Sequence, residues 1–160
     1  MFSQTVEYAL RAVVYLAQHQ SEGPIGNRVI AEHTQVPTSY LSKILHDLAA
    51  REILQSRRGV GGGFQLAASP DELSVLDVVN AVDPLQRITG CPLSLPSHCE
   101  QLCPMHARLD ESLALVEQTL GKSTIREMMF EQSRPLPLRE SSPTAVHDGP
   151  VTDGGLPDGD

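Results

Sequence analysis

Apolar residues recur at helical spacing over residues 3–19, at the start of the chain. The stripe consists of Val6, Leu10, Val13, Val14 and Ala17, with Leu16 at its flank. Positions three and four apart share one face of a helix, so the pattern predicts an amphipathic helix that packs on a core. Gly23, Pro24 and Gly26 come next and indicate a turn.

A shorter pattern predicts a helix over residues 27–34, with Asn27 as its N-cap. Pro37 breaks this segment, and Thr38 or Ser39 is suited to cap a second helix that continues to residue 52. The apolar face of the second helix consists of Leu41, Ile44, Leu45 and Leu48. Two short helices joined by a tight turn are typical of a helix-turn-helix, whose second helix enters the major groove of DNA.

A glycine-rich hairpin is predicted after the second helix. Ile53 and Leu54 begin a strand, the sequence SRRGVGGG turns, and residues 64–66 resume a strand. Such a hairpin is a wing, and its arginines can reach phosphates or a minor groove. The glycines are not followed by Lys-Ser/Thr and do not open a helix, which excludes a phosphate loop.

The residues expected to contact DNA lie at the start of the second helix and in the wing. They are Thr38, Ser39, Tyr40, Lys43, Arg57, Arg58 and Gly59. A winged helix that contacts only other proteins is the alternative interpretation. The clustering of three basic side chains at these positions favours DNA.

The second half of the chain predicts a short helix within residues 69–83, ended by Pro84, and a longer helix over residues 107–121. The longer helix carries a heptad-like seam of Leu109, Leu113, Val116 and Leu120, which fits either a core or a dimer interface.

From residue 133 the chain is rich in Pro, Gly, Ser and Asp, which predicts a disordered acidic tail. We expect a mainly α fold with a small β-wing: a winged helix-turn-helix domain over 1–83, a loop and dimerisation helix over 84–132, and the tail over 133–160.

The charge of the chain is unevenly distributed. The net charge is −8, yet residues 1–67 hold six Lys and Arg against five Asp and Glu. Residues 68–132 hold four against ten, and residues 133–160 hold two against five. A binding surface depends on the local field, so the first segment alone is suited to face a polyanion. The sequence shows neither a signal peptide nor an apolar run long enough to span a bilayer, so we expect a cytoplasmic protein with no membrane partner.

All three cysteines lie in one stretch, which reads CPLSLPSHCEQLCPMH. Cys91, Cys99, Cys103 and His106 have the spacing C-x7-C-x3-C-x2-H, and His98 lies among them. Thiolates and imidazole together select zinc or an iron–sulfur cluster, and an odd number of cysteines argues against a disulfide framework. A zinc-stabilised structural winged helix is one alternative. An enzyme with Cys103 as nucleophile and His106 as base lacks a third orienting group and an oxyanion motif, so we do not expect an enzyme.

Residues 2–131 resemble the winged-helix iron–sulfur transcription regulators that include IscR and the nitric-oxide sensor NsrR. The resemblance rests on EYALRAVVYLA, on IAEHTQVPTSYLSKILHDLAAREIL, on the wing SRRGVGGGFQLA, and on CPMH followed by a leucine-rich helix. It implies a homodimeric repressor that binds a palindromic DNA operator. It also implies that a bound cluster alters DNA affinity in response to nitric oxide, redox state or iron–sulfur status.

The resemblance implies two possible ligand sets. Three cysteines and His106 resemble the [2Fe–2S] site of IscR, and Cys99 lies nearer to Cys103 than the even spacing usual in the family. Glu7 stands where NsrR-type proteins have an acidic residue that reaches a [4Fe–4S] cluster across the dimer. Local spacing favours His106 and therefore [2Fe–2S]. Glu7 also has an ordinary interpretation, a surface ion pair with Arg11 four residues on.

Overall fold

The computed structural model describes residues 2–91 and 101–130. The helices are α1 (Gln4–Gln18), the 3-10 turn η1 (Gln20–Glu22), α2 (Asn27–Thr34), α3 (Thr38–Ala50), α4 (Val75–Val82), α5 (Pro104–Lys122) and α6 (Ile125–Phe130); the strands are β1 (Leu54–Arg57) and β2 (Gly63–Leu66). The predictions on His98, on Cys99 and on the tail over 133–160 lie outside the described residues. No helix in residues 2–91 and 101–130 is long and apolar enough to cross a membrane.

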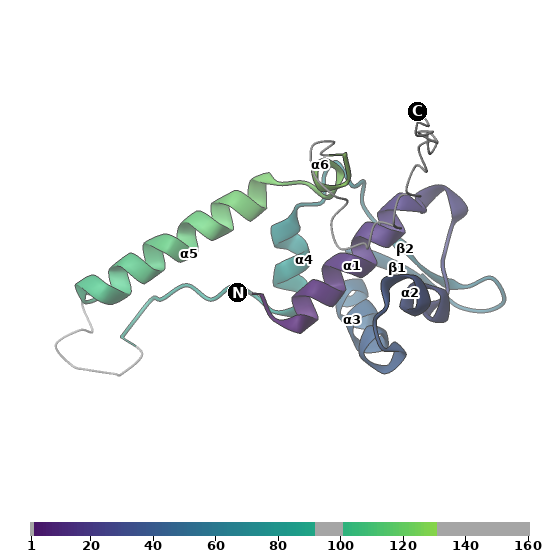
Figure 1. Ribbon diagram of the computed structural model, residues 1–160, viewed down its shortest axis with the longest axis horizontal. Helices are drawn as coiled ribbons and strands as arrows, with labels where there is room; N and C mark the ends of the chain where they lie inside the picture. Colours follow the sequence, from purple (N-terminus) through teal and green to yellow (C-terminus); the bar gives the residue numbers. More distant parts are fainter. Residues whose placement is uncertain (1, 92–100, 131–160) are drawn as a thin grey trace, which may run out of the picture.

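Helix α1 lies at the centre of the body, with α2, α3 and α4 packed around it (Figure 1). Ser3 caps it, because the Ser3 hydroxyl accepts the Val6 N–H at 3.4 Å. The predicted stripe is buried as expected. Leu16, expected at the flank, is also buried, since α6 and β2 contact α1 in addition to the three helices.

Helices α2 and α3 form the predicted helix-turn-helix, and the predicted apolar face of α3 is fully buried. Both predicted caps are wrong. Gly26 is the N-cap of α2, and Asn27 instead donates from its side-chain Nδ2 to the Ser42 Oγ at 2.5 Å. Pro37 is the N-cap of α3, without a side-chain hydrogen bond. The Asn27 amide therefore ties α2 to α3 rather than capping its own helix.

The wing is an antiparallel pair in which Leu54 faces Leu66 and Arg57 faces Gly63. Phe64 of β2 also exchanges two backbone hydrogen bonds with Ile25, each 2.9 Å long. Gly63 lies directly against the Ile25 carbonyl, and an added Cβ would overlap it. The absence of a side chain at Gly63 thus lets the wing attach to the segment between α1 and α2.

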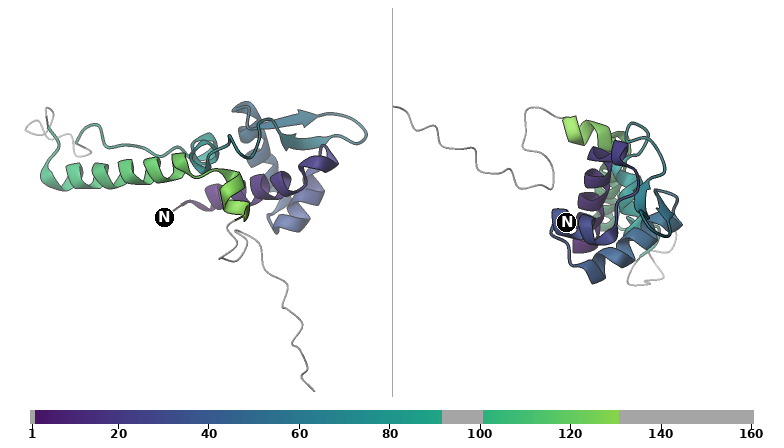
Figure 2. Two further views of the ribbon diagram at one scale, coloured as in Figure 1. Left: turned by 90° about the horizontal axis from the view of Figure 1, so that it is seen from above. Right: turned by 90° about the vertical axis from the view of Figure 1, so that its right-hand side faces the viewer.

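Helix α5 projects from the body, while α6 returns the chain to it (Figures 1 and 2). Ile125 of α6 is fully buried and its N–H donates to the Leu73 carbonyl at 2.9 Å. Helix α4 begins with a capping box, in which Ser74 and Asp77 satisfy each other's backbone N–H groups. The long helix begins at Pro104, three residues earlier than predicted, because Cys103 takes an extended conformation and serves as its N-cap.

Candidate DNA-binding surface and candidate metal centre

The DNA-contact residues predicted on α3 are all exposed. Thr38, Ser39 and Tyr40 lie in its first turn, and Lys43 follows one turn later. The buried face of α3 holds it against α1, so its polar face points outward. In a helix-turn-helix these N-terminal positions of the second helix are the ones that reach base edges.

The wing carries the remaining residues that are predicted to contact DNA. Arg57 ends β1, and Arg58 and Gly59 begin the turn; all three are exposed. Gly59 has a φ of 96°, a conformation that a side chain disfavours. The His46 ring on α3 meets the edge of the Phe64 ring on β2 at 5.8 Å between centroids. This contact, together with the packing of α3 on β1, holds the wing against α3.

Two further candidates were missed by the sequence analysis. His46 lies one turn after Lys43 on the exposed face of α3. Arg28 is exposed in the first turn of α2, three residues after Ile25, which pairs with the wing. The i, i+3 spacing from Lys43 was a usable signal for His46. No comparable signal existed for Arg28, because its proximity to the wing depends on a tertiary contact.

The candidate metal centre lies at the beginning of α5. The Cys103 Sγ and the His106 Nδ1 are 3.3 Å apart, so two potential ligands already converge. Cys103 is the N-cap, and His106 lies in the first turn of the helix rather than in a loop as predicted. The N-terminal end of a helix favours negative charge, which suits a thiolate-bound centre. No group of three potential ligands comes together among residues 2–91 and 101–130, a set that does not include Cys99.

Cys91 lies at the end of a segment that runs along α5, residues 84–91 (Figure 1). Arg87 in this segment pairs with Asp110 through two hydrogen bonds, Nε to Oδ1 at 2.7 Å and Nη2 to Oδ2 at 2.6 Å. Its Nη1 donates to Glu117 at 3.2 Å, and the Ile88 N–H donates to Asp110 at 2.8 Å. The Arg87 guanidinium, helped by the Ile88 amide, holds the pKa of Asp110 below its ordinary value.

Glu7 lies in the first turn of α1, in the body, whereas Cys103 and His106 lie at the far end of α5 (Figure 1). Within one protomer Glu7 is therefore apart from the candidate metal centre. Glu7 and Arg11, both among the described residues, do not form the expected ion pair. Arg11 instead lies over the Tyr8 ring at 6.0 Å and donates to the Thr34 carbonyl at 3.5 Å.

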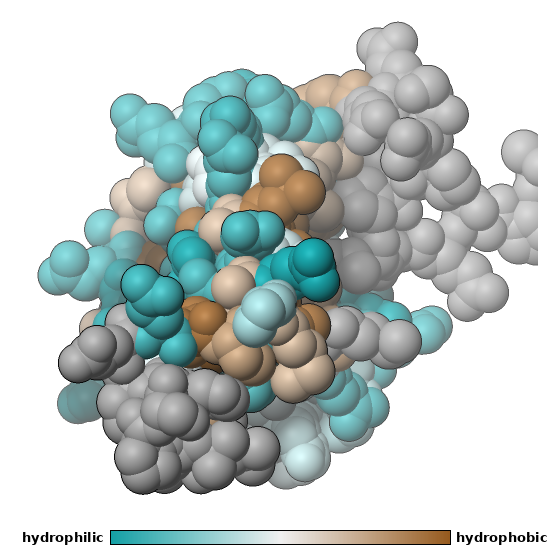
Figure 3. Space-filling model, turned by 90° about the vertical axis from the view of Figure 1, so that its left-hand side faces the viewer, coloured by the Kyte–Doolittle hydropathy of each residue, from teal (hydrophilic) through white to brown (hydrophobic). Residues whose placement is uncertain are grey.

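The four residues of the predicted seam on α5 differ in burial. Leu113 and Leu120 are half-buried, and Leu120 packs against the core. Leu109 and Val116 are 50% and 39% exposed. Val116 borders a groove of about 530 Å³, which is lined by Phe2, Leu85, Leu113, Leu115, Val116, Thr119 and Leu120. Figure 3, which faces the end where α5 begins, shows hydrophobic side chains reaching the surface.

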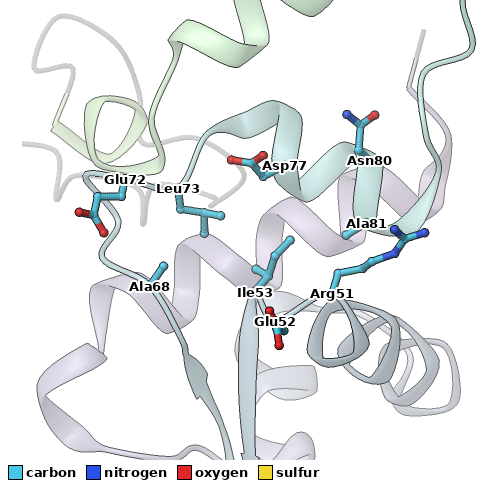
Figure 4. A pocket seen from close by; sticks show the side chains of 9 residues that line it. All are labelled: Arg51, Glu52, Ile53, Ala68, Glu72, Leu73, Asp77, Asn80 and Ala81. Carbon is cyan, nitrogen blue, oxygen red and sulfur yellow. The ribbon is translucent and has the colours of Figure 1, made fainter.

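A second hollow of about 300 Å³ lies between the end of α3 and α4 (Figure 4). Glu52, Glu72 and Asn80 line it, but their polar ends lie on different sides of the hollow in Figure 4. Asp77 is already engaged in the capping box of α4. Because the polar groups do not converge, this hollow has no arrangement suited to a specific ligand.

A helix-turn-helix with an exposed second helix beside a basic wing defines a winged-helix DNA-binding transcription regulator. Residues 2–131 match the profile of the Rrf2 family, described as "Iron-dependent Transcriptional regulator". The chain belongs to the Rrf2 family. It is a transcription regulator and not an enzyme, as the sequence predicted.

Individual relatives agree with this assignment. The chain is 28% identical over 150 residues to the HTH-type transcriptional regulator IscR of Aliivibrio salmonicida, covering 93% of this chain and 89% of that protein. It is 23% identical over 128 residues to NsrR of Shouchella clausii, covering 79% and 86%. The fold is similar to that of T. potens IscR, with a TM-score of 0.67, 22% identity, and coverage of 84% and 88%.

Proposed function

We propose that this regulator is a homodimeric repressor of a palindromic operator, and that an iron–sulfur cluster controls its affinity for DNA. Cys91, Cys99, Cys103 and His106 would hold the cluster. The observation that carries the proposal is the 3.3 Å contact between the Cys103 sulfur and the His106 Nδ1 at the start of α5. The similarity to IscR and NsrR and the iron-dependent description of the family support it.

The donor set fits such a group chemically. Thiolates are soft donors, and a histidine in place of one of them gives a site that is less tightly closed. An iron–sulfur cluster supplies a centre that exchanges electrons or loses iron when it meets its signal. The chain's own residues would hold that centre: Cys103 and His106 at the start of α5, Cys91 from the segment beside it, and Cys99. Three cysteines and one histidine favour [2Fe–2S].

The exposed part of the α5 seam supports dimerisation. Leu109 and Val116 are exposed, Val116 lines an apolar groove, and a second copy of α5 would cover both side chains. The opposite end of α5 is tied to the DNA-binding body, because the Val75 N–H donates to the Ser123 carbonyl at 2.9 Å and Ile125 is buried. A change at the cysteine end would therefore alter how the two bodies of a dimer are spaced.

The two bodies would read half-sites about one helical turn, or a multiple of it, apart. Thr38, Ser39, Tyr40 and Lys43 would enter the major groove. Arg57, Arg58 and Gly59 would bring the wing to phosphates or the minor groove. DNA contact would thus fall to the winged domain over 1–83, and cluster binding and dimerisation to the region over 84–132, whose α6 packs on that domain.

Two other centres remain candidates. Glu7 of the partner protomer in place of His106 would favour [4Fe–4S], as in the NsrR-type arrangement. Glu7 is exposed and lies apart from Cys103 within one protomer. It could therefore reach the cluster only from the partner protomer. Zinc bound by three cysteines and one histidine is the other candidate, and would make the centre structural.

Anaerobic purification followed by a visible absorption spectrum and counts of iron, sulfide and zinc tests the proposal. A chromophore with iron and sulfide in equal number is expected. His106→Ala should shift the spectrum or make the cluster labile, while Glu7→Ala should leave it unchanged. The reverse result would replace His106 by Glu7. Protein that carries zinc alone would refute control by a cluster and leave DNA binding in place.

A further inference from the structure

We propose that Arg87 positions Cys91 for the metal centre. Arg87, Asp110, Glu117 and the backbone N–H of Ile88 form a set of contacts that we call the Arg87 clamp. The clamp fastens the segment that precedes Cys91 to the same helix that carries Cys103 and His106. This inference rests on the proposed function, since it assigns a role to residues that do not themselves bind metal.

The clamp lies at the right distance from the candidate ligands. Asp110 follows His106 by one helical turn, about 6 Å along the axis at 1.5 Å per residue, and follows Cys103 by about 10 Å. Cys91 is four residues beyond Arg87, and four residues reach at most about 14 Å. The segment runs toward the beginning of α5 (Figures 1 and 2). With Arg87 held at Asp110, Cys91 is within reach of the Cys103 sulfur.

The contacts are more specific than an ordinary surface ion pair. A single exposed pair contributes little because each side chain must be ordered in water. Here one guanidinium binds both oxygens of Asp110 in parallel and also reaches Glu117, two turns along α5. The carboxylates are only 20% and 29% exposed. Planar arginine suits this geometry, and a lysine ammonium would satisfy only part of it.

The clamp also fixes the backbone. Asp110 accepts the Ile88 N–H at 2.8 Å, and at the other end of the segment Asn80 accepts the Leu85 N–H at 3.2 Å. Residues 85–88 are thus held at both ends, and Cys91 emerges only three residues later. Without the clamp, bringing Cys91 to Cys103 would require ordering a longer free chain, which costs conformational entropy.

Thiol bridging tests the positioning directly. In full-length, metal-free Cys99→Ser protein, Cys91 and Cys103 are the two remaining thiols. A short bifunctional alkylating reagent, dibromobimane, becomes fluorescent when it bridges two close thiols. Its intramolecular bridging rate is compared with the rate of alkylation by monobromobimane. Arg87→Ala should lower this ratio roughly threefold to tenfold, with Arg87→Lys between it and the parent.

Arg126→Ala is the matched control, because Arg126 forms an exposed ion pair with Asp71 at 2.8 Å, away from residues 84–91. It should leave the bridging ratio unchanged. Circular dichroism checks that each variant is folded, and Asp110→Asn replaces Arg87→Ala if the latter is not. Bridging in the folded clamp variant at the rate of the parent and of the Arg126 control would overturn the proposal.

Cluster retention gives a second readout in protein with all three cysteines. The rate at which an iron chelator bleaches the chromophore should rise roughly threefold to tenfold in Arg87→Ala and stay constant in Arg126→Ala. Equal bleaching of Arg87→Ala and the parent would overturn the positioning role. A parent protein without any iron–sulfur chromophore would refute the proposed function instead, and the bridging ratio would still decide whether the clamp positions Cys91.

Discussion

Gly63→Ala should detach the wing from the body. A Cβ at position 63 would overlap the carbonyl group of Ile25 and lie 2.7 Å from the backbone nitrogen of Gly26. These are backbone atoms, which cannot rotate away as a side chain can. The substitution therefore has to separate β2 from the segment between α1 and α2.

The magnitude follows from the contacts that the separation breaks. Two backbone hydrogen bonds of 2.9 Å join Phe64 to Ile25. Each contributes about 0.5–1.5 kcal/mol net, so Gly63→Ala should lower the free energy of unfolding by about 1–3 kcal/mol. Since Arg57 faces Gly63 in the hairpin, operator affinity should fall as well.

Urea denaturation followed by circular dichroism measures the stability change, and fluorescence anisotropy with a labelled operator measures the affinity. Gly90→Ala is the matched control, because a Cβ there meets no atom within 4 Å. It should change the free energy of unfolding by less than about 0.5 kcal/mol. If Gly63→Ala is no less stable than the Gly90 variant, the wing is not seated on Ile25 as described.

Further outcomes are expected at the other functional elements. Replacing Arg57 and Arg58 by Ala should weaken operator binding at every sequence and reduce the salt dependence by about two phosphate contacts; unchanged binding would remove the wing from DNA recognition. Leu109→Asp should produce monomers by light scattering, because the charge would be buried between two α5 helices; a stable dimer would place the interface elsewhere. The pKa of Asp110 is lowered in the folded state, so its ion pair stabilises the protein above pH 3.8 and is lost as pH falls through the lower folded value; in acid titrations Asp110→Asn should remove that part of the pH dependence. Truncation after Gln132 should leave the melting temperature unchanged, and a large drop would show that the tail packs on the body.

Sequence patterns predicted the elements whose faces are defined by burial. The stripe beginning at Val6 and the apolar face beginning at Leu41 gave α1 and α3 correctly, because one-sided burial imposes a helical period. The wing followed from its glycines. Caps were predicted less well, since Asn27 has a competing partner, Ser42, fifteen positions away in the chain.

The candidate metal centre shows a similar division. The clustering of cysteines indicated a metal centre in the stretch around Cys103. The combination of thiols and imidazole indicated zinc or an iron–sulfur cluster. The helical position of His106 escaped prediction, because the apolar period of the helix begins only after it, whereas Pro104 already occupies the first helical position. The pairing of Arg87 with Asp110 joins residues 23 positions apart and leaves no periodic pattern in the sequence.

Helix α5 is a rod whose C-terminal end is attached to the body, through Leu120 and through the residues that follow the helix. Its 19 residues span about 28 Å at 1.5 Å per residue. A tilt of about 10° at the attachment moves the cysteine end by about 5 Å, on the order of one helical turn. The same leverage works in reverse: a displacement of the sulfur atoms by a few ångströms turns the attached body through only a few degrees. Under the proposed function, the long arm would convert a chemical event at its tip into a small angular adjustment of the surface that reads DNA.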